Sequence, residues 1–282
     1  MRQLSVIGSR ADSGDADGAM SELNAIISNA SDPLYRIECY RLRSKIHRSQ
    51  HNLAAARESL DAASSCIQRN GQLGGLESHL DATLAMDRAD LEAFSAGNSD
   101  AAITLYDSVV SNRQSASRND VRYAMQNAAI LCSDGPRKPE AVRRVDAILR
   151  DASVMSEMPE SHVIGLRFSQ ASWIQSMGDL HSATEKYLAL WQDYPNSTNA
   201  QVIHSAVIVA SLRPVGVACA DRLTLASLAH ARMEAARQSN GELPMEYRDI
   251  EYQIAIVVVD SQECAGLDPT LLLWAQRIRN AR

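Results

Sequence analysis

The sequence is poor in the residues that interrupt regular secondary structure. Its 282 residues include only 13 glycines, 8 prolines and 2 phenylalanines. Glycine and proline together make up about 7% of the chain, where an average protein has about 12%. Alanine is abundant, and much alanine with few turn residues is a composition typical of helices. It argues against a β-sandwich, a propeller or a doubly wound α/β enzyme, which need many turns.

An excess of positive charge is also missing. The chain has 28 basic and 34 acidic residues, which gives a formal net charge of -6. This balance argues against a generally basic nucleic-acid-binding protein, although a local basic patch is compatible with it. Hydrophobic residues make up 45% and charged residues 22%, so the chain is expected to fold around a sizeable core.

The sequence has neither long apolar runs nor paired cysteine motifs. The number of cysteines is odd and no CxxC occurs, so we expect no disulfide or zinc framework, buried free thiols and a reducing compartment. The N-terminus has no apolar core of a signal peptide, and the longest apolar stretch, near 202–212, is too short to cross a bilayer. These features predict a cytoplasmic protein with no membrane segment. The cysteines are Cys39, Cys66, Cys132, Cys219 and Cys264.

Sequence motifs of catalysis and cofactor binding are missing as well. The sequence contains no GxxxxGK[ST], GxGxxG, GxSxG or HExxH motif. His47 and His51 have a spacing that suits a metal on a helix, but no nearby Asp or Cys completes a ligand set. The sequence therefore predicts no catalytic residues, no metal and no cofactor, and a chain that is not an enzyme. A catalytic set assembled from distant helices would leave no such local signal.

Apolar residues recur at three- and four-residue spacing along nearly the whole chain. Asp32 before Pro33 is typical of a helix start, and Gly97 and Gly178 fall where helices should end. The pattern predicts an all-α chain of about 13 helices, with short connections that make neighbours antiparallel. We expect helices over 16–29, 33–50, 53–69, 76–96, 99–111, 118–133, 139–155, 160–177, 180–193, 198–212, 219–239, 244–262 and 269–281.

A spacing of small and aromatic residues repeats along the chain. Gly178, Ala183 and Tyr187 have the same spacing as Gly97, Ala102 and Tyr106. An alanine side chain ends at Cβ, so two helices can approach closely where it lies between them. Five segments have an alanine at the corresponding position, at intervals of 37 to 46 residues. These alanines are Ala19, Ala56, Ala102, Ala141 and Ala183.

This pattern resembles the tetratricopeptide repeat family, whose unit is a helix pair of about 34 residues. The best match covers 164–195, with Ala171 on the first helix, Gly178 at the turn and Pro195 at the exit. The spacings exceed the family's, so the repeats are irregular. The resemblance covers about residues 14–195 and implies a right-handed superhelical solenoid of antiparallel helix pairs. We expect repeats over 1–195, and further helices with a capping helix over 196–282, continuous with the same solenoid.

In the resembled family, the first helix of each pair lines a concave groove. The resemblance implies that Arg41, Lys45 and Arg48 face this groove as a basic stripe, which would bind acidic groups. A solvated helix face is the alternative for this stripe. Exposed phenylalanines would anchor apolar side chains, the alternative being packing between repeats. The other implied groove residues are Asp87, Leu91, Phe94, Tyr123, Gln126 and Phe168.

These features predict a non-catalytic protein–protein interaction scaffold or adaptor that binds an acidic or apolar peptide or helix in its groove. One alternative is a ribonucleoprotein assembly subunit that binds RNA, or an RNA-binding partner, through the Arg-rich stretches 36–57 and 113–150. Another is a peptide-sensing module of a signalling regulator whose output domain lies on a different protein. We expect the combined substitution Arg41→Glu and Arg48→Glu to abolish partner binding and to leave the melting temperature nearly unchanged.

Overall fold

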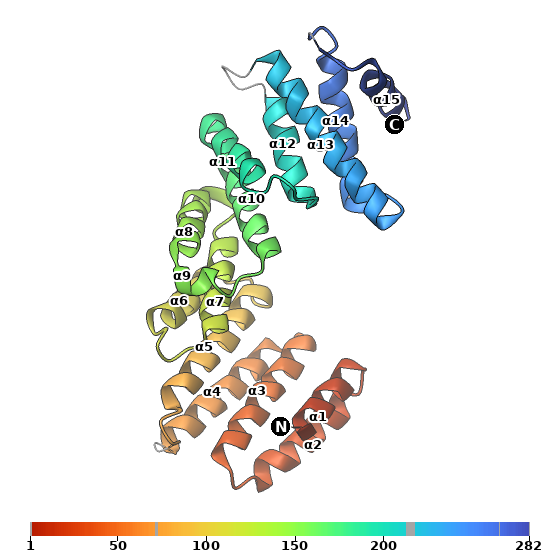
Figure 1. Cartoon of the computed structure of the whole chain (residues 1–282). Coiled ribbons are helices and arrows are strands. Elements are labelled where there is room, and N and C mark those ends of the chain that lie inside the picture. Colours follow the sequence, from red (N-terminus) through yellow and green to blue (C-terminus); the bar gives the residue numbers. More distant parts are fainter. Residues whose placement is uncertain (1, 71–72, 213–217, 265, 282) are drawn as a thin grey trace. The chain divides into compact units, whose positions relative to one another are not determined.

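The computed structural model describes residues 2–70, 73–212, 218–264 and 266–281. Within these ranges the chain forms fifteen α-helices and two short 3₁₀ turns, and no strand (Figure 1). The all-α fold class predicted from composition and periodicity is confirmed. The solenoid arrangement stays a prediction.

The helices pack into two compact units. Unit 1 comprises Met1–Asp134 and Arg150–Val154, and unit 2 comprises Gly135–Leu149 and Met155–Arg282. The boundary lies near residue 134, whereas the expected change from repeats to other helices lies near residue 195. Unit 1 contains α1 (Arg2–Asp12), α2 (Ala16–Asn29), α3 (Pro33–Ser49), α4 (Leu53–Arg69), α5 (Glu77–Phe94), α6 (Ser99–Ser111) and α7 (Arg118–Leu131). Unit 2 contains α8 (Lys138–Arg150, whose last residue is counted with unit 1), α10 (Glu160–Ser176), α11 (Leu180–Asp193), α12 (Ala200–Leu212), α13 (Cys219–Asn240), α14 (Arg248–Asp260) and α15 (Pro269–Asn280). The remaining elements are α9 (Ala152–Met155) and the 3₁₀ turns η1 (Gly135–Arg137) and η2 (Met245–Tyr247).

Most helices begin and end within two residues of the predicted positions, and two differences have a local cause. Helix α1 was not expected, because its residues bury only two apolar side chains, Leu4 and Ile7. The segment predicted as one helix over 139–155 is two helices, α8 and α9. Asp151 interrupts it, because its Oδ1 accepts hydrogen bonds from the backbone N–H groups of Ser153 and Val154 and so caps a new helix.

The second helices of the hairpins begin in a shared way. In α2, α4, α6 and α11 an Asp or Asn caps the helix by accepting a hydrogen bond from the backbone N–H three residues later. The fourth residue of each of these helices, and of α8, is one of the five alanines identified from the repeat. All five are fully buried, as close helix packing requires: Ala19, Ala56, Ala102, Ala141 and Ala183.

The repeated tyrosine has one role in both units. Tyr106 and Tyr187 are among the largest fully buried side chains. A buried hydroxyl needs a hydrogen-bond partner, and each of these donates to the preceding helix. Tyr106 Oη donates to Asp90 Oδ1 at 2.6 Å, and Tyr187 Oη donates to Gln175 Oε1 at 3.1 Å. The shared spacing therefore marks equivalent positions in two hairpins.

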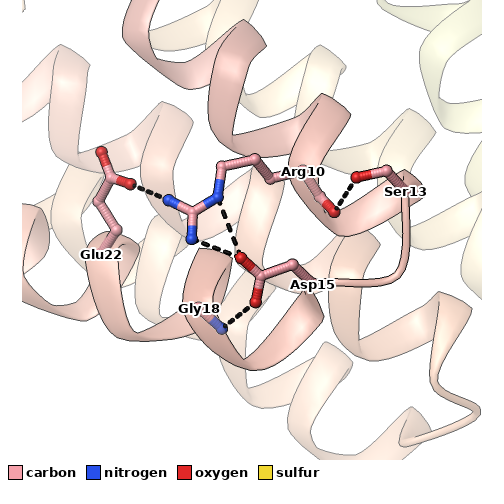
Figure 2. Close-up of polar contacts among 5 residues, drawn as sticks. All are labelled: Arg10, Ser13, Asp15, Gly18 and Glu22. Atoms are coloured by element: carbon pink, nitrogen blue, oxygen red, sulfur yellow. Dashed lines mark hydrogen bonds and ion pairs between the residues drawn. The ribbon is translucent and has the colours of Figure 1, made fainter.

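The first hairpin is tied together by Arg10 (Figure 2). Its Nη1 donates to Glu22 Oε2 at 2.8 Å, and its Nη2 donates to Asp15 Oδ2 at 2.5 Å. Asp15 Oδ1 also accepts from the backbone N–H of Gly18 at 3.1 Å. A Cβ atom at Gly18 would lie 2.5 Å from both Arg10 Nη2 and Asp15 Oδ1. Only glycine leaves room for this arrangement.

We expect alanine at Gly18 and alanine at Gly8 to have different effects on the free energy of unfolding. Alanine in a helix interior is favoured over glycine by about 1 kcal/mol. Gly8→Ala should gain part of this, because the added Cβ would lie 3.5 Å from Leu42 Cδ1, an ordinary contact. Gly18→Ala should show no net stabilisation, because displacing the Asp15 cap costs about 1 kcal/mol and offsets the higher helix propensity of alanine. Urea denaturation measures both; equal stabilisation by the two substitutions would contradict the arrangement around Arg10.

The cysteines divide into two groups. Among the described residues, Cys39, Cys66 and Cys132 are buried and form no disulfide, as expected. Cys219 and Cys264 form a disulfide, with their Cα atoms 5.9 Å apart, and the expectation that every cysteine is free is wrong for these two. The bond joins the first residue of α13 to the segment between α14 and α15. Because disulfides are rare in reducing compartments, the cysteines no longer argue for such a compartment.

The most apolar segment of the sequence forms helix α12, which has 13 residues. A bilayer-spanning helix needs about 20. Within the described ranges, none of the helices combines the length and the apolar character that such a span requires.

Candidate functional site

A hollow of about 630 Å³ opens in unit 1 across the N-terminal halves of α3, α5 and α7. Helix α5 packs against both α3 and α7, which brings the starts of these three helices together (Figure 1). Leu34 and Tyr35 of α3 line the hollow together with Leu76 and Leu80 at the start of α5. We call this cavity the unit 1 hollow. It has an apolar floor that could accept a side chain of a partner.

Arg41 lies at the inner edge of the unit 1 hollow and is held by two carboxylates. Its Nε donates to Asp87 Oδ2 at 2.5 Å, and its Nη1 donates to both oxygens of Glu38 at 2.9 and 3.0 Å. The side chains of Arg41 and Asp87 are only 17% and 14% exposed. Burial alone would lower the pKa of Arg41, but these bonds outweigh it and raise the pKa. The structure thus brings Arg41 and Asp87 together, and Arg41 is not a free cation awaiting an acidic partner.

Lys45 and Arg48 continue the stripe along α3. Lys45 is exposed and Arg48 is half-buried. Both cations attract the carboxylate of Asp90 on α5. Burial raises the pKa of Asp90, although the hydrogen bond from Tyr106 and the two cations act to lower it. In the described part of the chain, neither Lys45 nor Arg48 forms an ion pair. The basic stripe of α3 therefore faces an acidic stripe on α5.

Exposed apolar side chains continue along the same helices beyond the hollow. Phe94, at the end of α5, is 60% exposed, and Tyr123 and Ile130 of α7 are 38% and 52% exposed. Residues three, four and seven apart share a helix face. Thr83, which lines the hollow, lies eleven residues before Phe94, which is about three helical turns, so the two share a face of α5. The positions predicted for Phe94 and Tyr123 are thus on the surface and open to a partner.

Leu91 and Gln126 lie differently. Leu91 is 1% exposed and belongs to a core cluster with Ile37, Leu60 and Leu84, so its expected place on the groove surface is wrong. Asp90, one position earlier, faces the basic stripe instead. The helix phase inferred for this part of α5 was off by one residue. Gln126 of α7 is half-buried.

Phe168 lies in unit 2. It packs against neighbouring helices, which was the alternative to anchoring an apolar side chain of a partner. Its ring is half-buried, with its centroid 5.5 Å from that of Tyr187 in an edge-to-face arrangement and 5.5 Å from that of His204. His204 Nε2 lies 2.9 Å from Gln253 Oε1, and burial lowers the pKa of His204. His204 and Gln253 line a second hollow, of about 420 Å³, and among the described residues its lining carries no carboxylate, lysine or arginine.

The histidine spacing noted in the sequence brings no ligand set together. His47 is half-buried in the last turn of α3, whereas His51 is exposed in the following turn with a φ of 58°. Across the described residues, no group of three or more His, Cys, Asp or Glu side chains could hold a metal ion.

The residues at the starts of the helices, Asp32, Ser117 and Asp120, were not among the predicted site residues, whereas Glu38 was expected to neutralise part of the charge of Arg41 and does pair with it. Asp32 and Ser117 cap α3 and α7, so capping explained their presence without reference to a site. Glu38 lies one helical turn before Arg41 on the same face of α3, so the stripe could have been followed back toward the N-terminus. Asp120, near the start of α7, lines the same hollow as these residues. The hollow could therefore have been found by following the face of each helix back to its capping residue.

A scan against protein-family models finds no match to this chain, and a search of curated proteins finds no relative. The resemblance to tetratricopeptide repeats therefore stays a prediction. What the chain does has to be argued from its geometry.

Proposed function

We propose that the chain is a non-catalytic interaction scaffold that binds a segment of a partner protein across α3, α5 and α7. The unit 1 hollow carries this proposal, because apolar side chains line it and the exposed Phe94, Tyr123 and Ile130 lie further along two of its helices, α5 and α7. Apolar side chains gathered on an exposed surface mark interaction sites in soluble proteins. An amphipathic segment in a groove is a common recognition mode.

A protein partner fits the observed pairing of the arginines better than RNA does. Arg57 donates to Glu92 at 2.9 Å, and Arg113 donates to Asp151 at 2.6 Å. Each cation is therefore partly neutralised by a neighbouring helix or turn. Binding to a nucleic-acid backbone depends on cations that are available to phosphates. Arg57 and Arg113 are thus less available to phosphates than unpaired cations would be.

A cytoplasmic location is part of the proposal, and the cysteines allow a test of it. Structural disulfides are rare in reducing compartments. Lysing cells directly in denaturant that contains N-ethylmaleimide exposes the buried thiols to the reagent. Labelling of all five cysteines would show that the bond between Cys219 and Cys264 is reduced in the cell, as a cytoplasmic location requires. Labelling of only Cys39, Cys66 and Cys132 would indicate an oxidising compartment and contradict this location.

Selection of peptides tests the binding function directly. A phage library of random 12-residue peptides, panned on the purified protein, should yield peptides that bind. Phe94→Asp should weaken their binding at least tenfold, because it places a charge on the apolar surface. Met245→Asp is the matched control, since Met245 is 79% exposed on η2 in unit 2. No enrichment, or equal effects of both substitutions, would contradict the proposal.

A further inference from the structure

We propose that the unit 1 hollow selects a partner segment that carries a basic side chain beside an apolar one. This inference rests on the proposed function and names the chemistry of the partner. It differs from the sequence-based expectation of an acidic or apolar partner. The lining of the hollow, rather than the stripe further along α3, carries the argument.

Carboxylates outnumber cations at the hollow. Asp32, Glu38 and Asp120 line it, and Arg41 is its one lysine or arginine among the described residues. Arg41 is shared between Glu38 and Asp87, so two carboxylates already offset its charge. The site therefore has a surplus of negative charge. A groove walled by protein concentrates this field and favours a cation over an anion.

The apolar floor determines what kind of cation fits. Leu34, Tyr35 and Leu80 line the hollow beside the carboxylates, and Leu76 is 44% exposed there. Lysine and arginine bury their methylene stems on apolar surface while the charged head stays at a polar rim. An adjacent apolar side chain would cover the remaining floor. A protein segment supplies both groups at once, as a small inorganic cation does not.

Two of the carboxylates can be neutralised without loss of their structural role. Asp32 Oδ1 accepts a hydrogen bond from the backbone N–H of Leu34 at 3.0 Å, and Asp120 Oδ2 accepts one from Ser117 Oγ at 2.7 Å. Each carboxylate has further lone pairs for a ligand. Asparagine caps helices as well as aspartate does. Asp32→Asn with Asp120→Asn therefore removes charge from the hollow while leaving the Arg41 pairs in place.

The experiment uses two fluorescein-labelled mixtures of 12-residue peptides, alike in apolar content. One mixture contains Lys and Arg but no Asp or Glu, and the other has the reverse composition. Fluorescence anisotropy at low salt should show at least tenfold tighter binding of the basic mixture. Asp32→Asn with Asp120→Asn should weaken that binding at least fivefold. Asp179→Asn with Asp268→Asn is the matched control: it also removes two charges, both residues cap helices of unit 2, and binding should stay unchanged.

The outcomes separate this inference from the proposed function. Tighter binding of the acidic mixture, or equal effects of the double substitution in the hollow and of the control double substitution in unit 2, overturns the inference. The second result would mean that the basic mixture responds only to the net charge of the protein. Absence of binding by both mixtures, together with no enrichment in the phage selection, overturns the proposed function as well. Thermal melts of each variant verify that the fold is retained.

Discussion

Arg41→Glu should destabilise unit 1 by about 3 to 5 kcal/mol, the cost of removing one partner from a buried ion pair. The new carboxylate would lie beside Glu38 and Asp87, which now hold the guanidinium. Three carboxylates would then share a site that is mostly shielded from water. Urea denaturation followed by circular dichroism measures the change in the free energy of unfolding.

Arg48→Glu is the matched control, because Arg48 lies two turns further along the same stripe and forms no ion pair in the described part of the chain. Its cost should be under about 1 kcal/mol, as for surface charges. A free energy of unfolding of Arg41→Glu within about 1 kcal/mol of that of the native protein would contradict the pairing of Arg41 with Glu38 and Asp87. The result also bears on function: the double charge reversal, which the sequence predicts to leave the melting temperature nearly unchanged, should destabilise unit 1, so a loss of binding in that variant would not by itself locate the site.

Reducing the disulfide between Cys219 and Cys264 should destabilise unit 2 by about 2 to 4 kcal/mol. The bond closes a loop with a sequence separation of 45 residues, which restricts the unfolded chain. It also fastens the start of α13 to the segment that leads into α15. Denaturation with and without dithiothreitol measures the loss.

The variant Cys219→Ser with Cys264→Ser supplies the control for this experiment. It should match the reduced native protein in stability, and dithiothreitol should not change it further. The other cysteines are already free thiols, so the reductant has no other bond to break among them. Equal stability of the native protein with and without reductant would contradict the disulfide.

The helices were predictable because their signals are local. Capping residues, apolar spacing and the buried alanines depend on neighbours within a few turns of the chain, and α4, α6 and α11 begin and end as predicted. Helix α1 escaped because its apolar face is short. The break before α9 escaped because Asp151 redirects backbone hydrogen bonds in a segment whose apolar periodicity continues.

The site was predictable only in part, because its decisive contacts join residues far apart in sequence. Arg41 and Asp87 are 46 positions apart. The spacing of residues along α3 alone could not show that a carboxylate of α5 forms an ion pair with this arginine. Cys219 and Cys264 illustrate the same limit. Leu91 shows a different limit. Helix periodicity gives the spacing of residues on one face, but which face points to the core depends on the packing of neighbouring helices.

Photo-crosslinking from exposed positions on α5 and α7 tests the central claim most directly. A benzophenone amino acid placed at Phe94, and separately at Tyr123, would be activated in cells that contain the full set of partners. Mass spectrometry of the products should show one recurring segment of a protein linked to both positions, and no such product from Met245. Products that are the same from all three positions, or none from Phe94 and Tyr123, would contradict a partner-binding groove on α3, α5 and α7.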